Sequence, residues 1–254
     1  MEVDIYLTSI ARNREQKIER IPKRKKKTTM QKTPTLTVML TYNDLTASNA
    51  YEIFDSCKDS PAEFWGFKEE PLPLPEMQEL FDYMRQCGKK TVLEVVCYDE
   101  EESLAGAEMA VQCGCDYLMG TIFTDRILAF CQAHRLKYLP FVGRVTQRPS
   151  ILEGEIDDMI AEAKEYLRKG VDGIDLLGYR YTGDASALIR RFVDEVPAPV
   201  CVAGSVNSLR RLDEIKAIQP WSFTIGSAFF DHCFGDSFAD QIATVCRYMQ
   251  GDPA

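Results

Sequence analysis

The sequence predicts a single (β/α)8 barrel, or TIM barrel, preceded by a basic N-terminal extension. Short apolar runs alternate with helical patterns eight times along residues 34–254, which is the order of a parallel sheet and a usual length for one barrel. The last two apolar runs each end in Gly-Ser. A doubly wound open sheet is the alternative. It usually has fewer strands and a glycine-rich first turn, whereas residues 42–45 contain no glycine.

The first four strand–helix pairs are marked by apolar runs and by helices that stop at a glycine or begin at a capping residue. Met77, Leu80, Phe81 and Met84 have the three–four spacing of an amphipathic helix. Thr124 is placed to cap the fourth helix. We therefore expect strands at residues 36–42, 63–68, 91–97 and 116–120, and helices at residues 48–57, 74–87, 100–113 and 124–134.

The last four pairs contain the longest predicted helix and both Gly-Ser turns. Gly170 ends that helix, and unbroken apolar runs indicate buried parallel strands. We expect strands at residues 137–142, 171–177, 199–203 and 221–225, and helices at residues 153–169, 185–196, 209–218 and 237–249.

Charge divides the chain into two parts. The 254 residues carry a net charge of −9, which argues against nucleic acid as a partner of the whole molecule. Residues 1–29 have a net charge of +5, and residues 30–254 have a net charge of −14. We expect residues 1–33 to be a disordered tail because like charges repel one another. A nuclear-type address, an anion-binding arm and a natural start at Met30 are the alternatives.

Cysteine content and hydropathy point to a cytoplasmic protein without a membrane span. Most of the nine cysteines lie inside predicted elements, which suits buried, reduced thiols. Cys113 and Cys115 lack the second ligand pair of a structural zinc site, so we expect no metal and no cofactor. No apolar run has the length of a membrane span, and the N-terminus has no signal-peptide pattern.

The two Gly-Ser turns predict a phosphate-binding site. Gly204–Ser205 and Gly226–Ser227 follow the seventh and eighth strands, and the second turn leads into a short helix. Glycine lets the backbone approach a ligand, serine adds a hydroxyl donor, and amide groups at a helix start favour an anion. Such a site is common at this place in a barrel, although two ordinary loops would also contain Gly and Ser.

Three charged residues near the carboxyl ends of strands are candidates for catalysis. Glu94 and Asp175 interrupt apolar strands, where a carboxylate is costly unless it is paired. Lys68 ends the strand next to that of Glu94, and Gly66 on the same face leaves room inside the barrel. Burial and mutual charge would shift the pKa values of an acid–base set of Lys68, Glu94 and Asp175. A structural ion pair is the alternative.

Two arginines and one histidine near strand ends complete the candidates. Arg144 and Arg180 could bind a substrate anion, or they could be solvated loop residues. His232 could carry a proton, but its position is the only evidence for this role.

With both turns in view, residues 35–250 resemble the ribulose-phosphate-binding barrel superfamily. The resemblance rests on the barrel periodicity and on the sequences Ala-Gly-Ser at 203–205 and Ile-Gly-Ser-Ala at 225–228. It implies that Gly204, Ser205, Gly226 and Ser227 hold a phosphate, with a backbone contact from Gly178. The metal set of the pentose-phosphate epimerases, the strand-six lysine of the phosphogluconate-type aldolases and the Asp-x-Lys-x-x-Asp pattern of the orotidylate decarboxylases are absent, so no single member is assigned.

The leading hypothesis is a metal-independent isomerase or epimerase that acts on a small phosphorylated metabolite. Lys68 and Asp175 would exchange protons at a carbon next to a carbonyl, and Glu94 would position Lys68 or share the role of base. One alternative is an aldolase or synthase in which Lys68 forms a Schiff base. The other is a barrel that binds a phosphorylated ligand without turnover.

Overall fold

Eight parallel strands form the centre of the protein. The computed structural model describes residues 33–251, so the predicted extension at residues 1–33 lies outside it apart from Thr33. In spatial order the strands are β10 (Ile174–Leu176), β11 (Val200–Val202), β12 (Ser222–Ile225), β1 (Thr35–Met39), β4 (Phe64–Lys68), β5 (Lys90–Val95), β6 (Tyr117–Gly120) and β7 (Lys137–Leu139). Main-chain hydrogen bonds from Asp172 to Tyr138 (3.0 Å) and from Asp175 to Pro140 (3.1 Å) join the region of β10 to that of β7. The predicted (β/α)8 barrel is therefore confirmed.

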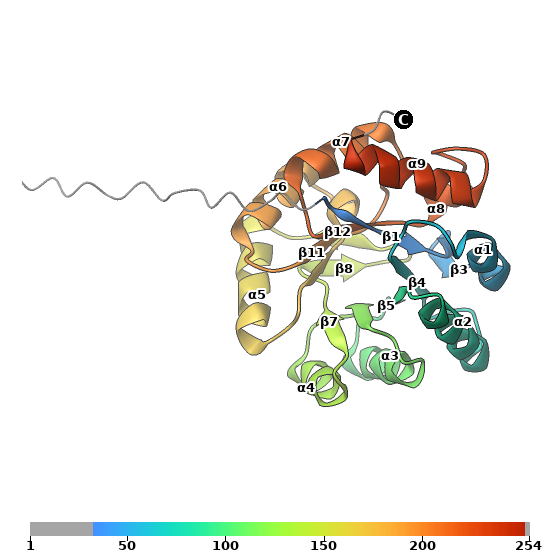
Figure 1. The fold of residues 1–254 in the computed structure, drawn as a ribbon. Helices are drawn as coiled ribbons and strands as arrows, with labels where there is room; N and C mark the ends of the chain where they lie inside the picture. Colours follow the sequence, from blue (N-terminus) through green and yellow to red (C-terminus); the bar gives the residue numbers. More distant parts are fainter. Residues whose placement is uncertain (1–32, 252–254) are drawn as a thin grey trace, which may run out of the picture. The chain divides into compact units, whose positions relative to one another are not determined.

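Helices surround the strands, one after each strand of the barrel (Figure 1). They are α1 (Ala50–Cys57), α2 (Leu74–Gln86), α3 (Glu100–Gln112), α4 (Asp125–His134), α5 (Ile156–Lys169), α6 (Ala185–Glu195), α7 (Leu209–Ile218) and α9 (Phe238–Gln250). The side chain of Thr124 accepts a hydrogen bond from the amide of Ile127, which confirms the predicted cap of α4. Within residues 33–251, no helix combines the length and the hydropathy that a membrane span requires.

Two short antiparallel hairpins at the carboxyl ends of the strands were not predicted. One joins β2 (Thr41–Tyr42) to β3 (Leu45–Thr46), and the other joins β8 (Arg144–Thr146) to β9 (Ile151–Glu153). The first takes the end of the strand expected at residues 36–42. The second takes the start of the helix expected at residues 153–169, so α5 begins at Ile156. A one-turn 3-10 helix, η1 (Gly178–Arg180), follows β10, and a short helix, α8 (Ser227–Phe230), follows β12 as expected.

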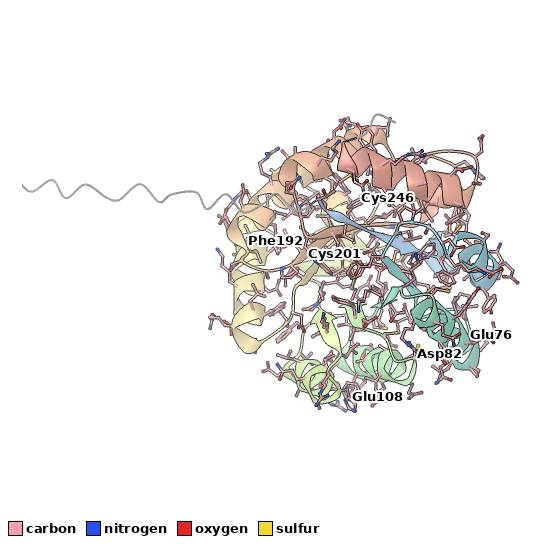
Figure 2. The ribbon with its side chains drawn as sticks, viewed as in Figure 1. Glu76, Asp82, Glu108, Phe192, Cys201 and Cys246 are labelled. Atoms are coloured by element: carbon pink, nitrogen blue, oxygen red, sulfur yellow. The ribbon has the colours of Figure 1, made fainter. Side chains whose placement is uncertain are left out.

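The interior of the barrel changes from apolar to polar along the strands. Phe64, Val92, Tyr117, Leu139 and Cys201 belong to an apolar cluster that is separate from the larger core between strands and helices. Figure 2 shows Cys201 among the strands, whereas Glu76 and Glu108 lie on the outer helices. Lys68 lies four positions after Phe64 in β4, and Glu94 lies two positions after Val92 in β5. Because side chains alternate between the two faces of a strand, Lys68 and Glu94 also point into the interior of the barrel.

Gly66 lies where β4 and β5 approach each other closely. It is paired with Val92 in the ladder, and a Cβ atom at position 66 would lie 2.3 Å from the carbonyl oxygen of Val92. A methyl group there must displace the backbone, because the atom that it would meet is a main-chain oxygen and not the end of a flexible side chain. We expect Gly66→Ala to lower the free energy of unfolding by about 1–3 kcal/mol, measured by urea denaturation. A change within about 0.5 kcal/mol, the range of neutral surface substitutions, would contradict this expectation.

Candidate active site

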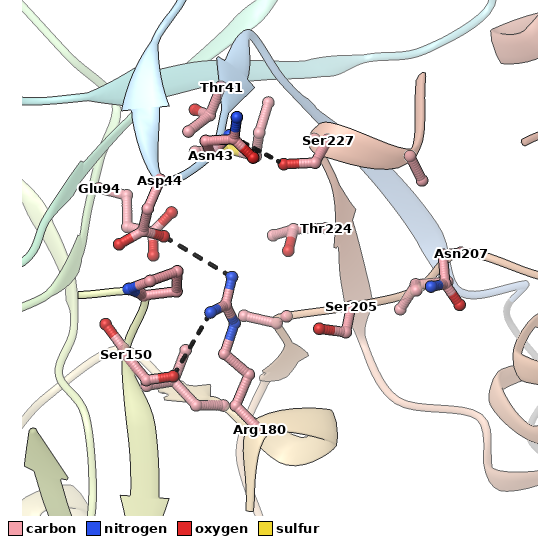
Figure 3. A pocket seen from close by; sticks show the side chains of 18 of the residues that line it. Thr41, Asn43, Asp44, Glu94, Ser150, Arg180, Ser205, Asn207, Thr224 and Ser227 are labelled. Atoms are coloured by element: carbon pink, nitrogen blue, oxygen red, sulfur yellow. Dashed lines mark hydrogen bonds and ion pairs between the residues drawn. The ribbon is translucent and has the colours of Figure 1, made fainter. Parts of the chain in front are cut away.

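A cavity of about 230 Å³ opens at the carboxyl ends of the strands. This is the end at which barrels of this kind hold their ligands. The strands β1, β4, β5 and β12, the β2–β3 hairpin, the loops after β10, β11 and β12, and the tip of the β8–β9 hairpin contribute to its wall. Figure 3 shows several of the side chains that line it. The residues that line it are Met39, Thr41, Asn43, Asp44, Lys68, Glu94, Pro149, Ser150, Leu177, Arg180, Ala203, Gly204, Ser205, Val206, Asn207, Thr224, Gly226, Ser227, Ala228 and Asp231.

Lys68 lies in the wall of this cavity between two carboxylates. Its Nζ atom is 2.6 Å from Oδ1 of Asp44 and 3.3 Å from Oε1 of Glu94, and all three side chains are less than one-tenth exposed. Burial alone would lower the pKa of Lys68, but the negative charges of Glu94 and Asp44 outweigh it, so the pKa of Lys68 is raised. The lysine is therefore a charged ammonium group at neutral pH. The predicted proximity of Lys68 and Glu94 is confirmed.

Thr46 fixes the backbone that carries this lysine. Its hydroxyl group accepts a hydrogen bond from the Lys68 amide at 2.9 Å and donates one to the Lys68 carbonyl at 2.8 Å. Thr46 is in β3, so the β2–β3 hairpin holds the end of β4. The same hairpin presents Asp44 to the ammonium group.

Asp175 lies inside the barrel but does not line the cavity. It is in β10, directly beside Cys201 of β11, and it is 0 % exposed. Neither carboxylate oxygen has a hydrogen-bond partner among the described residues. Burial, followed by the negative charge of Glu94, raises the pKa of Asp175 well above its usual range, which favours the protonated form of the side chain. The direct proton exchange between Asp175 and a substrate that we expected from the sequence has no contact to support it, because the side chain is sealed from the ligand space.

Both Gly-Ser turns line the cavity, as the sequence predicted. Gly204 and Ser205 have positive φ angles of 82° and 53°, which turn the chain sharply after β11. Ser227 opens α8, and its Oγ accepts a hydrogen bond from the Asn43 amide at 3.2 Å. Gly178 is a correction: it is buried in η1 and does not border the cavity. A Cβ atom there would lie 2.5 Å from Cγ1 of Ile189, so this glycine allows close packing against α6.

The two predicted arginines have different environments. Arg180 extends across the cavity towards Asp44 (Figure 3), with Nη2 3.7 Å from Oδ1 of Asp44 and Nη1 3.5 Å from the carbonyl oxygen of Ser150. A Cβ atom on Gly204 would lie 2.7 Å from Cγ of Arg180, so the arginine stem rests on the Gly-Ser turn. Arg144 is the correction: it is 72 % exposed, lies outside the cavity and forms an ion pair with Glu153 across the β8–β9 hairpin.

The hairpin supplies a different arginine, Arg148, that the sequence did not single out. Its guanidinium group pairs with Glu69 at 3.2 Å and donates a hydrogen bond to the carbonyl of Asp44 at 3.3 Å. The hydroxyl group of Tyr98 also donates to the carbonyl of Gln147 at 2.7 Å. These contacts hold the hairpin tip, with Ser150, over one side of the cavity.

His232, the candidate proton carrier, lies outside the cavity, and no metal-binding cluster occurs in the described part of the chain. His232 is exposed and does not line the cavity, whereas its neighbour Asp231 does. Among residues 33–251, no group of three or more His, Cys, Asp or Glu side chains is arranged to hold a metal ion.

Asp44 is the main site residue that sequence reasoning did not select. The pair Asn43–Asp44 directly follows the first strand, and both residues have positive φ angles, of 48° and 69°. Asn and Asp tolerate this conformation better than other non-glycine residues. The sequence signal that could have identified Asp44 is therefore the pair Asn43–Asp44, two polar residues that favour tight turns and that directly follow a predicted strand.

The fold defined by these elements is a (β/α)8 barrel, which this chain shares with solved structures of low sequence identity. No protein-family model matches the chain, and no curated protein sequence matches it. A native KDPGal structure superposes with a TM-score of 0.64 at 13% identity, covering 87% of this chain and 96% of that one. Phosphoribosylanthranilate isomerase from Thermotoga maritima gives 0.58 at 13% identity, covering 86% and 99%. N-acetylmannosamine-6-phosphate 2-epimerase from Clostridium perfringens gives 0.56 at 13% identity, covering 76% and 86%. At these identities the similarity establishes the fold alone.

Proposed function

We propose that the protein is a metal-independent isomerase or epimerase of a small phosphorylated metabolite. The observation that carries this proposal is the arrangement of one cavity. An ammonium group between two carboxylates lies in one part of its wall, and two Gly-Ser turns lie in another. The solved barrels of similar fold include an isomerase and an epimerase, which makes this chemistry compatible with the fold.

The phosphate group would bind between the two turns and Arg180. Backbone amides and serine hydroxyl groups at Ser205 and Ser227 can donate hydrogen bonds to phosphate oxygens. Arg180 is the nearest cation to the Gly204 turn, and its contacts with Asp44 and Ser150 are long for hydrogen bonds. Its guanidinium group can therefore exchange these contacts for a phosphate without losing a strong partner.

The reacting carbon would lie beside Lys68 and Glu94. Glu94 faces the cavity, and among residues 33–251 no cation lies closer to it than Lys68, at 3.3 Å. It is therefore the base that would remove a proton from a carbon next to a carbonyl. The ammonium group of Lys68 would stabilise the negative oxygen that develops and would replace the charge of a metal. In an isomerase, Glu94 would then return the proton to the neighbouring carbon on the same face, whereas epimerisation would need a second acid on the opposite face of the substrate.

The Schiff-base alternative requires Lys68 as a neutral amine. The raised pKa of Lys68, caused by Glu94 and Asp44 despite burial, opposes this form. Borohydride treatment in the presence of a carbonyl substrate should therefore leave Lys68 unmodified by mass spectrometry. Trapping of the substrate on Lys68 would favour the aldolase or synthase alternative.

A thermal-shift screen against phosphorylated sugars, phosphorylated amino-acid intermediates and inorganic phosphate tests the proposal. A ligand at 100 times its dissociation constant should stabilise the protein by about 2.7 kcal/mol. Gly204→Asp should abolish this response, because it adds a negative charge beside Arg180 and a side chain where a Cβ atom is already too close. Gln250→Asp on α9 makes the same change of charge at an exposed position and should keep the response.

Turnover is then measured by NMR. The signal is the exchange of a hydrogen atom bound to a carbon of the ligand for deuterium from the solvent. Binding together with exchange supports the isomerase or epimerase. Binding without exchange supports a barrel that only binds its ligand. Absence of any response to phosphorylated compounds would show that the proposal is wrong.

A further inference from the structure

A groove of about 180 Å³ lies on the outside of the barrel between α1 and α2 (Figure 1). It shares no lining residue with the candidate active site. Its apolar surface comes from Ala50, Tyr51, Leu72 and Leu80, and Ser48, Glu76 and Glu79 complete the lining. The Tyr51 side chain is 41 % exposed. Exposed aromatic side chains of this kind are enriched where proteins contact one another.

The carboxylates beside this groove are not neutralised by the basic side chains of the two helices. Lys58, directly after α1, and Arg85 in α2 each pair with an aspartate three residues earlier in the chain. Within residues 33–251, three exposed carboxylates of α1 and α2 form no ion pair: Glu52, Glu76 and Glu79. The apolar groove therefore has a negatively charged margin.

The ring of Tyr51 adds a second attraction for a cation. It stacks on the ring of Tyr83, with 5.3 Å between the centroids and an interplanar angle of 20°. This contact orients the Tyr51 ring before any partner arrives. A Lys or Arg side chain over an aromatic face is attracted by the ring quadrupole, in addition to its attraction to nearby carboxylates.

The charge of the groove margin decides between possible occupants. Nucleic acid and anionic lipid carry phosphate groups, which unpaired carboxylates repel. A second copy of the barrel is also disfavoured, because residues 30–254 carry a net charge of −14 and two such surfaces repel each other. A positively charged protein segment with an apolar side chain complements both the margin and the floor of the groove.

We propose that the groove between α1 and α2 is a docking site for a basic segment of a partner protein that carries a large apolar side chain. The apolar side chain enters the groove against Tyr51 and Leu72, and the neighbouring Lys or Arg residues pair with Glu76 and Glu79. This inference goes beyond the proposed function and does not depend on it, because the groove and the candidate active site have separate linings.

Fluorescence anisotropy with three labelled peptides and the complete 254-residue chain tests the docking site. The peptide Arg-Lys-Leu-Phe-Lys-Arg should bind at least about tenfold more tightly than Glu-Glu-Leu-Phe-Glu-Glu, which has the opposite charge. It should exceed Arg-Lys-Ser-Gly-Lys-Arg, which lacks the apolar side chains, by a similar factor. Raising the salt concentration from about 50 mM to about 500 mM should weaken its binding, because exposed charges are screened.

Variants of exposed residues locate the binding. The double variant Glu76→Lys, Glu79→Lys should weaken binding of the basic apolar peptide at least about tenfold, and Tyr51→Ser should weaken it several-fold. The double variant Glu108→Lys, Asp194→Lys makes the same change of net charge at exposed positions on α3 and α6, and it should keep the affinity. Melting temperatures measured for each variant show whether a loss of binding reflects a loss of folding.

Four results would overturn the docking site. They are no saturable binding of the basic apolar peptide, equal affinity for the peptide that lacks apolar side chains, and an equal loss of binding in the Glu108→Lys, Asp194→Lys control. The fourth is a dimer in analytical ultracentrifugation that Glu76→Lys, Glu79→Lys dissociates, because this result would assign the groove to a second copy of the chain. None of these results bears on phosphate binding, so failure here leaves the proposed function in place.

Discussion

Replacement of Lys68 with methionine is expected to slow turnover by at least about 100-fold and to lower the free energy of unfolding by about 3–5 kcal/mol. Methionine keeps the length of the stem but removes the cation from two carboxylates that are each less than one-tenth exposed. Glu94 would then lose the ion-pair partner that it has among the described residues, and Asp44 would keep only the more distant Arg148 and Arg180, each at 3.7 Å. The loss of the acid and electrostatic role should reduce the rate by about 10²–10⁴-fold, measured by the deuterium-exchange assay, and urea denaturation at pH 7 measures the stability.

A compensating variant distinguishes charge from packing in this prediction. Adding Asp44→Asn to Lys68→Met removes one of the two carboxylate charges and should restore part of the lost stability without restoring turnover.

Because the folded-state pKa of Lys68 is raised, its ionic stabilisation is fully present below the unfolded-state pKa of about 10.4 and is lost as the pH rises through the folded-state pKa. A Lys68→Met protein as stable as the wild type at pH 7 would show that the ion pairs contribute nothing net.

The barrel and its two Gly-Ser turns could be predicted because their signals are local. Each strand is a short apolar run, and helices such as α2 bury residues at three–four spacing, here Met77, Leu80, Phe81 and Met84. The eight-fold repetition of this pattern specifies the order of a parallel barrel. The phosphate prediction used Gly204 and Gly226 in the same way, since Gly226 directly follows β12 and Gly204 lies two residues after the end of β11.

The parts that could not be predicted depend on how loops fold back over the barrel. Arg144 and Arg148 lie four residues apart in one loop, and only the β8–β9 pairing decides that the first faces solvent and the second reaches Asp44 and Glu69. Asp175 and Glu94 both interrupt apolar strands, yet one is sealed and the other borders the cavity. This difference in exposure depends on how far each side chain lies from the open end of the barrel. The pattern of apolar residues along one strand does not predict that distance.

The second large effect that we expect concerns Asp175, whose replacement by asparagine should flatten the dependence of stability on pH. Burial and the charge of Glu94 raise the folded-state pKa of Asp175 well above its unfolded value of about 3.9. The stability of the wild-type protein therefore falls as the pH rises from about 3.9 to the folded-state pKa, by about 1.4 kcal/mol per pH unit, because folding must take up a proton. Asparagine has a similar shape and does not titrate.

Urea denaturation of the wild-type and Asp175→Asn proteins at pH 4.5 and pH 7 measures this difference. The advantage of the variant should grow with pH over this interval, by about 1.4 kcal/mol for each pH unit that lies below the folded-state pKa of Asp175. Glu108→Gln on α3 removes an exposed carboxylate and serves as the control. Parallel curves for the wild-type protein and Asp175→Asn would mean that Asp175 is ionised when folded, in contact with a cation that the described contacts do not include.

The same variant also decides whether Asp175 takes part in the reaction. A carboxyl group sealed inside the barrel can influence the charge of Glu94, but it cannot reach a ligand in the cavity. Turnover by Asp175→Asn that remains within about tenfold of wild type, with a shifted pH–rate profile, would indicate a positioning role that acts through Glu94. A loss as large as that of Lys68→Met, in a protein that binds ligand normally, would instead restore Asp175 to the proton-transfer role that its place in an apolar strand first suggested.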